Sequence, residues 1–339
     1  MTTYVLYNRD GAIDEFFNSI TTVTRQQCDE FAISRAGGVS SALQMQGVCS
    51  YTVTAGPNKT KLFQFRDENS TINMANIVIA KAVHPEFVTS CKYLGTMGGF
   101  AASPYLRDGV SPWDCSYNGA YSLSTICPDS ITLLRTLQGT PSKVVASFSW
   151  NNNLQPCSDT TATLLMEFQS SFDLLARNLP SRFAANLERV REELPSLFKI
   201  LPFVLSHGDL NMMNLLVNPK TGNITGIVDW AEARILPFGF ALYGLEHLLG
   251  WMDSEGWHYY DHYCELESLF WQTFREEAHN FSDADLYLIS AARMAGFFYH
   301  YGFNFDTKGE IQSVRMDRPD GSLAYLDAFC AAGKWTPLS

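Results

Sequence analysis

The sequence predicts an α+β fold with two lobes, a small N-terminal lobe built on an antiparallel sheet and a larger, mainly helical C-terminal lobe. Short segments rich in β-branched and aromatic residues, separated by turn residues, dominate residues 42–106. Between residues 164 and 194, apolar residues instead recur at the spacing of a helix face. We therefore expect the N-lobe to span residues 1–106 and the C-lobe to span residues 107–339.

The N-lobe begins with a segment in which apolar and polar residues mix, which indicates one or two short helices. Gly56-Pro-Asn58 is a turn signal between two strand-like runs. The expected elements, in chain order, are short helices within 12–35, strands at 42–48, 50–55 and 61–66, a helix at 71–83, and strands at 92–100 and 101–106.

Residues 109–118 are turn-rich, and we expect them to mark the boundary between the lobes. We expect the region from there to about residue 158 to help shape a substrate site. Pro180 should end the first long helix, and Ser181 should cap the next. Aromatic residues are dense over 251–271, where they would either wall a pocket or pack between helices. The other expected elements are helices at 164–179, 183–194, 241–249, 283–301 and 323–332, and a hairpin at 214–217 and 224–228.

Three polar residues around that hairpin predict chemistry. Asp209 precedes Asn214 by the spacing of a kinase catalytic loop, and Asp229 follows the second strand. A carboxylate such as Asp209 can orient an alcohol and take its proton. Magnesium prefers hard oxygen ligands, which Asn214 and Asp229 supply from the two ends of the hairpin.

These residues lie in two motifs, His207-Gly-Asp-Leu-Asn-Met-Met-Asn214 and Gly226-Ile-Val-Asp-Trp230, that resemble the aminoglycoside phosphotransferase and choline kinase-like family. The resemblance implies a protein-kinase-like fold, with Asp209 as catalytic base and Asn214 and Asp229 as magnesium ligands. His207 joins the catalytic group, where we expect it to fix the loop by hydrogen bonding. Weaker similarity to fungal members covers three further segments: Ser50-Tyr-Thr-Val53, Leu62-Phe-Gln-Phe-Arg66 and Gly256-Trp-His-Tyr-Tyr260.

The third strand should carry the cation that grips the nucleotide phosphates. Arg66 best matches this position, and Gln64 lies on the same face of the strand. Tyr105 lies in a predicted hinge at 104–106, where an adenine would find backbone donors and acceptors. The helix at 71–83 contains no Asp or Glu to pair with the cation, which departs from the kinase pattern.

Composition limits the partners. With 46% hydrophobic and 17% charged residues the chain is globular, and a net charge of −11 argues against nucleic acid. No apolar leader or membrane-length run is present, and the eight cysteines form no Cys-x-x-Cys pair. We expect a reduced, cytoplasmic enzyme that acts on a small molecule, away from membranes. The sequence does not predict an oligomeric state.

The sequence thus predicts an ATP- and Mg²⁺-dependent phosphotransferase that acts on a hydroxyl group of a small molecule. The missing helix carboxylate and the aromatic C-lobe also motivate an alternative. In that alternative, the kinase fold serves a step without phosphoryl transfer, such as cyclisation or rearrangement in fungal-type secondary metabolism.

Overall fold

The computed structural model describes residues 7–47, 49–59, 61–98, 103–108, 153–217, 224–280, 282–306, 310–317 and 322–333. These residues form two compact units. The first contains the described residues up to 108 together with 213–217 and 224–231, and the second contains 153–212 and those from 232 onward. The predicted lobe boundary at residue 106 stays a prediction, since residues 109–152 lie outside the described part.

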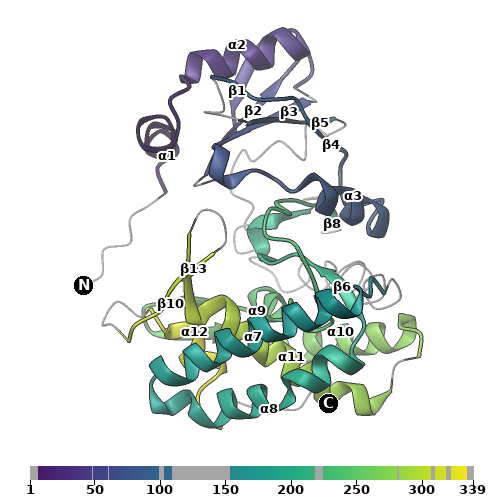
Figure 1. Ribbon diagram of the computed structural model, residues 1–339. Coiled ribbons are helices and arrows are strands. Elements are labelled where there is room, and N and C mark those ends of the chain that lie inside the picture. The colour runs from purple at the N-terminus through teal and green to yellow at the C-terminus, as the bar shows by residue number, and fades with distance from the viewer. Residues whose placement is uncertain are drawn as a thin grey trace. The chain divides into compact units, whose positions relative to one another are not determined.

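The first unit is organised around a five-stranded antiparallel sheet with strand order β1-β2-β3-β5-β4 (Figure 1). Residues 50–55 and 61–66 form strands as predicted. The sheet strands are β1 (Ser40–Ala42), β2 (Ser50–Ala55), β3 (Lys61–Arg66), β4 (Cys91–Tyr93) and β5 (Ser103–Asp108). The helical segments are α1 (Arg9–Glu15), a π-helical turn (Phe16–Ile20), α2 (Arg25–Ala36), a 3₁₀ turn (Glu68–Ser70) and α3 (Met74–Val83).

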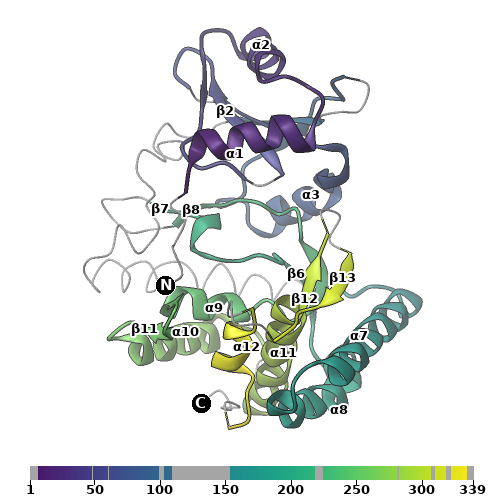
Figure 2. The ribbon, with the colours of Figure 1, turned by 90° about the vertical axis from the view of Figure 1, so that its left-hand side faces the viewer.

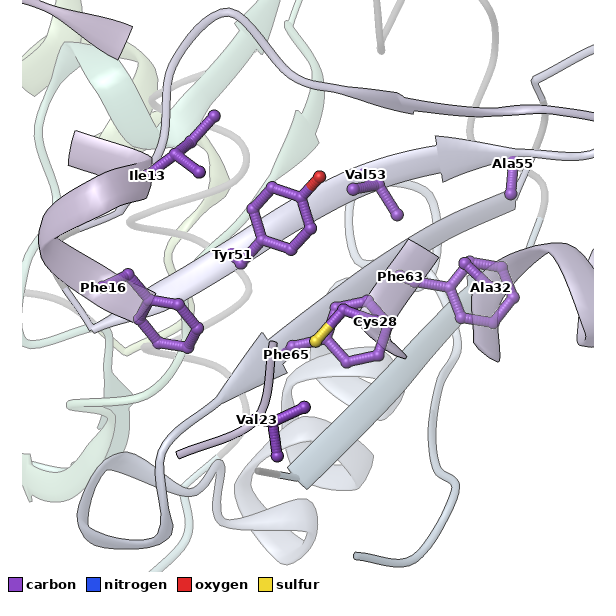
Figure 3. Close-up of a cluster of buried hydrophobic side chains, with 10 residues drawn as sticks. All are labelled: Ile13, Phe16, Val23, Cys28, Ala32, Tyr51, Val53, Ala55, Phe63 and Phe65. Carbon is purple, nitrogen blue, oxygen red and sulfur yellow. The ribbon is translucent and has the colours of Figure 1, made fainter. Parts of the chain in front are cut away.

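An apolar core joins the N-terminal helices to one face of β2 and β3 (Figure 3). Alternate strand residues supply this face, as the two-residue period of a strand requires. A capping box between Thr24 and Gln27 fixes the start of α2. The core residues are Ile13, Phe16, Val23, Cys28, Ala32, Tyr51, Val53, Ala55, Phe63 and Phe65.

The strand predicted over residues 42–48 is wrong, because β1 already ends at Ala42. Beyond that point the Gln46 side chain takes the place of a strand neighbour. Its Oε1 accepts the N–H of Thr52 at 2.8 Å, and its Nε2 donates to the Thr52 carbonyl at 3.0 Å. A side chain can thus satisfy backbone groups that a ladder would otherwise pair.

The predicted hinge at 104–106 is also wrong. These residues lie within β5, whose backbone has neighbours on both sides. Tyr105 is paired with Gln64 on β3 and with Tyr93 on β4. The predicted helix at 71–83 is confirmed from Met74 onward, where the side chain of Asn73 caps its start.

The predicted hairpin is confirmed. β7 (Leu215–Val217) and β8 (Ile224–Ile227) are antiparallel, with Leu215 opposite Ile227. A 3₁₀ turn (Met212–Asn214) leads into β7. The N–H of Ile227 donates to the Phe87 carbonyl at 2.8 Å, so the hairpin is tied to the segment that follows α3.

The second unit is mainly helical, and α7 and α8 run side by side in it (Figures 1 and 2). Ring contacts from Phe168 to Phe240 at 5.0 Å and to Phe198 at 5.7 Å fill its core. Its helical elements are α7 (Ser158–Asn178), a 3₁₀ turn (Ser181–Phe183), α8 (Ala184–Ile200), α9 (Tyr243–Leu249), α10 (Tyr263–Glu277), α11 (Asp283–Gly302) and α12 (Ala324–Phe329).

Three antiparallel strand pairs in this unit were not predicted. They are β6 (Phe203–Ser206) with β9 (Arg234–Pro237), β10 (Gly250–Asp253) with β11 (Gly256–Tyr259), and β12 (Phe303–Phe305) with β13 (Ile311–Val314). Their strands are three or four residues long, too short to show a clear alternation.

The aromatic residues of 251–271 mostly pack, which favours the second of the two interpretations. Trp271 is buried, and the rings of Trp257 and Phe329 lie 4.9 Å apart. Trp251 and Tyr259 differ, because they are 42% and 39% exposed, and Trp251 stacks on His258. In the part of the chain that the structure describes, no helix is long and apolar enough to cross a membrane.

Candidate active site

The hairpin brings Asn214 and Asp229 together, as predicted. Asn214 directly precedes β7, and Asp229 lies two residues after β8. The N–H of Val228 donates to the Asn214 carbonyl at 3.0 Å and extends the ladder to this end. Trp230 anchors the next position, since its indole N–H donates to the Ile227 carbonyl at 3.1 Å and its ring stacks on His84.

Asp229 has two features of a ligand-binding residue. Its φ of +60° lies in the left-handed region, which is uncommon for residues other than glycine and clusters at functional sites. Its Oδ1 is shielded from solvent and accepts no hydrogen bond from the described residues, although the side chain as a whole is 43% exposed. A buried carboxylate oxygen of this kind is costly unless a cation approaches it. The set of hard oxygens on Asn214 and Asp229 therefore fits Mg²⁺.

Arg66 lies at the end of β3 with its side chain only 9% exposed. Its Nε donates to the Ser70 carbonyl at 2.6 Å, and its Nη1 lies 3.6 Å from Oδ1 of Asp229. The helix at 71–83 has no carboxylate to pair with Arg66, and Asp229, the predicted metal ligand, supplies one instead. Sequence reasoning did not foresee this contact, because the two residues belong to separate motifs.

Gln64 and Tyr105, the other two residues predicted to bind nucleotide, are neighbours across β3 and β5. Nε2 of Gln64 donates to the Ser50 hydroxyl at 3.3 Å, while its Oε1 is buried and has no hydrogen-bond partner among the described residues. The Tyr105 hydroxyl accepts the N–H of Ile72 at 2.9 Å, and the residue is 2% exposed. Nucleotide-binding roles for both residues stay predictions.

In the second unit, the loop after β6 carries His207 and Asp209. Gly208 between them has a φ of +86°, and a Cβ at this position would lie 2.3 Å from the Glu232 carbonyl oxygen. Only glycine can adopt this backbone so close to the segment before β9. The sharp turn therefore depends on Gly208.

Two hydrogen bonds within the loop hold Asp209, one through its backbone and one through its carboxylate. The N–H of Asp209 donates to Nδ1 of His207 at 3.3 Å, and Nδ2 of Asn211 donates to Oδ1 of Asp209 at 2.8 Å. The ring of His207 is buried. These contacts agree with the predicted loop-fixing role of His207, which stays a prediction. Asn211 was missed, although its place two residues after Asp209 is a typical position for a local side-chain hydrogen bond.

Two residues distant in sequence hold the loop through its backbone. The Tyr243 hydroxyl, on α9, donates to the Gly208 carbonyl, and Nδ1 of His300, on α11, lies 3.1 Å from the same hydroxyl. Because the hydroxyl proton is directed at the carbonyl, Nδ1 of His300 must be the donor to Tyr243. Burial lowers the pKa of His300 to about 3 and raises that of Tyr243, so both groups are neutral at physiological pH. No sequence motif marked either residue.

Solved structures with this fold are similar to the chain over most of its length. One is the GDP and kanamycin complex of APH(2'')-IIIa, with 11% identity, 80% of this chain and 90% of that chain covered, and a TM-score of 0.50. A streptomycin–ATP–APH(2'')-IIa ternary complex has 10% identity, coverage of 82% and 91%, and a TM-score of 0.48. Amicoumacin kinase hAmiN in complex with AMP-PNP, Ca²⁺ and Ami has 13% identity, coverage of 87% and 85%, and a TM-score of 0.46.

The five-stranded antiparallel sheet and the helical second unit form a kinase-like fold. The family model for the phosphotransferase enzyme family, APH, matches residues 91–265. The chain belongs to this family, and it is an enzyme of the small-molecule phosphotransferase class. No curated protein matches the chain.

Proposed function

We propose that the protein transfers the γ-phosphoryl group of ATP to a hydroxyl group of a small molecule in a Mg²⁺-dependent reaction. The observation that carries this proposal is the buried Oδ1 of Asp229, which accepts no hydrogen bond from the described residues and lies at the hairpin end that also presents Asn214. Together with family membership, this oxygen set supports a metal–nucleotide site.

The chain's own residues would act as follows. Asp209 accepts the proton of the acceptor hydroxyl. The hydroxyl oxygen forms a bond to the γ-phosphorus of ATP, and the bond from that phosphorus to the bridging oxygen of ADP breaks. Asn211 and His207 keep Asp209 in place through the contacts above. Asn214 and Asp229 would hold Mg²⁺, which offsets the charge of the phosphate oxygens when bound. Arg66 would bind phosphate through its forked guanidinium.

A thermal-shift measurement tests the proposal. ATP with Mg²⁺ should raise the melting temperature, because a ligand that binds only the native state stabilises it by mass action. ATP in the presence of EDTA should give a clearly smaller rise. If millimolar ATP with Mg²⁺ causes no shift, the nucleotide assignment fails, and the alternative of a reaction without phosphoryl transfer becomes the better explanation of the fold.

A further inference from the structure

The guanidinium of Arg66 is a buried cation with two partners among the described residues. One is the neutral Ser70 carbonyl at 2.6 Å, and the other is the Asp229 carboxylate at 3.6 Å. A buried charge requires a counter-charge, and the carbonyl alone does not supply one. Asp229 therefore supplies the negative charge beside Arg66.

Asp229 has a matching requirement. Its buried Oδ1 accepts no hydrogen bond from the described residues, and the 3.6 Å separation from Nη1 of Arg66 exceeds a good charge-assisted hydrogen bond. The left-handed backbone of Asp229 is fixed on one side by the β8 ladder and on the other by Trp230. The carboxylate is thus positioned for a cation that approaches more closely than Arg66 does.

The sequence of α3 explains why the Asp229 carboxylate would pair with both Arg66 and a metal ion. In protein kinases, a helix glutamate pairs with the phosphate-binding lysine, while a separate aspartate binds the metal. No acidic residue lies between Ser70 and His84 in this chain. The basic residue at the end of β3 consequently contacts the metal-ligand position itself.

We propose that Arg66 is a placeholder for the divalent cation. In the nucleotide-free protein its guanidinium neutralises Asp229, and it moves to the nucleotide phosphates when the metal ion occupies Asp229. This inference rests on the proposed function, because it requires Asp229 to bind a metal. It adds that Arg66 weakens metal binding in the absence of nucleotide and strengthens nucleotide binding in the presence of metal.

The exchange makes metal and nucleotide binding interdependent. A metal ion alone must displace Arg66 from Asp229, whereas phosphate groups offer Arg66 a new anionic partner. Binding of either the metal ion or the nucleotide therefore separates Arg66 from Asp229 and lowers the free-energy cost of binding the other. This is positive coupling between the two ligands. The coupling would be carried by one side chain.

The variant Arg66→Gln tests the exchange, because glutamine can still donate to the Ser70 carbonyl but carries no charge. Mn²⁺ affinity without nucleotide and ADP affinity with and without Mn²⁺ are measured by titration calorimetry. Arg66→Gln should bind Mn²⁺ about fivefold or more tightly, the scale of a partly exposed ion pair, and should bind Mn²⁺–ADP more weakly. Lys61→Gln, which removes a charge at the other end of the same strand, should match the wild type.

Unchanged or weaker Mn²⁺ binding by Arg66→Gln overturns the placeholder role. If the wild type still binds Mn²⁺–ADP in that case, the proposed function survives. If the wild type binds neither Mn²⁺ nor ADP, both proposals fail together.

A second variant covers the case in which Arg66→Gln does not fold. Asp229→Asn releases Arg66 from its carboxylate, so ADP in EDTA should bind severalfold more tightly than to the wild type. ADP with Mn²⁺ should bind more weakly, because a charged ligand of the metal is lost. Equal or weaker ADP binding in EDTA would contradict the placeholder role.

Discussion

At the scale of single residues, the loop around Asp209 assigns different tasks to neighbouring side chains. Nδ1 of His207 accepts the N–H of Asp209, so a neutral imidazole carries its proton on Nε2. Asn211 directs its amide at the Asp209 carboxylate. Since one nitrogen of His207 is committed to the loop backbone, the contacts are consistent with the proposed role of Asp209 as the base.

The substitution Asp209→Asn should lower phosphoryl-transfer turnover by about 10²–10⁴-fold, the usual contribution of a positioned base. Nucleotide affinity should remain, because the predicted metal ligands are Asn214 and Asp229. Turnover and ADP titration measure the two effects separately. Asn211→Ala, the control, should cost less, since it removes only the group that orients the base. A loss of nucleotide binding in Asp209→Asn would assign this carboxylate to the metal instead.

Among the elements, a strand pair and two helices hold the loop that carries Asp209. β6 and β9 are paired from Phe203 to Ser206, and the segment before β9 approaches Gly208. Tyr243 on α9 donates to the Gly208 carbonyl from 35 positions away in sequence. The geometry of the loop is therefore determined largely by tertiary contacts.

Gly208→Ala should destabilise the protein by more than about 2 kcal/mol, because a left-handed backbone costs about 1–2 kcal/mol for an L-residue and the new Cβ would collide with a carbonyl oxygen. Gly95 provides the control. Its φ is +99°, but a Cβ added there would have no neighbouring atom within 4 Å, so Gly95→Ala should cost only the backbone contribution. Urea denaturation compares the two variants, and equal losses would mean that the Glu232 contact is unimportant.

The sequence predicted elements that depend on local contacts and missed features that depend on contacts between distant residues. The hairpin strands at 214–217 and 224–228 were predictable because turn residues and flanking apolar runs are local signals. The strand predicted over 42–48 was wrong beyond Ala42, where a side chain, Gln46, bonds to the backbone of Thr52. The Arg66–Asp229 contact and the support from Tyr243 join residues far apart in sequence, which no spacing rule reveals.

At the scale of the whole molecule, the second unit encloses ionisable groups of two kinds. Arg293 is paired with buried Glu246 and lies 3.2 Å from Glu267, so its charge is compensated. His247 and His300 instead contact tyrosine hydroxyls, and burial lowers their pKa values to about 4 and about 3. The charge of Arg315, and that of His247 once it is protonated, lower the pKa of His300 further. The fold therefore requires both imidazoles to be neutral.

This requirement makes the free energy of unfolding depend on pH in a defined window. Both folded-state pKa values lie below the unfolded value of 6.5, so between pH 6.5 and about 4 the unfolded chain binds more protons than the folded chain. The contribution of the two neutral imidazoles to the free energy of unfolding is complete above pH 6.5. It decreases as the pH falls, by at most about 1.4 kcal/mol per pH unit for each histidine. Urea denaturation at several pH values measures the slope.

The double variant His247→Gln, His300→Gln should be less stable at pH 8 but should show a shallower slope, and the difference from the wild type separates the histidines from titrating carboxylates. Equal slopes in the two proteins would show that these imidazoles are protonated without cost in the folded state.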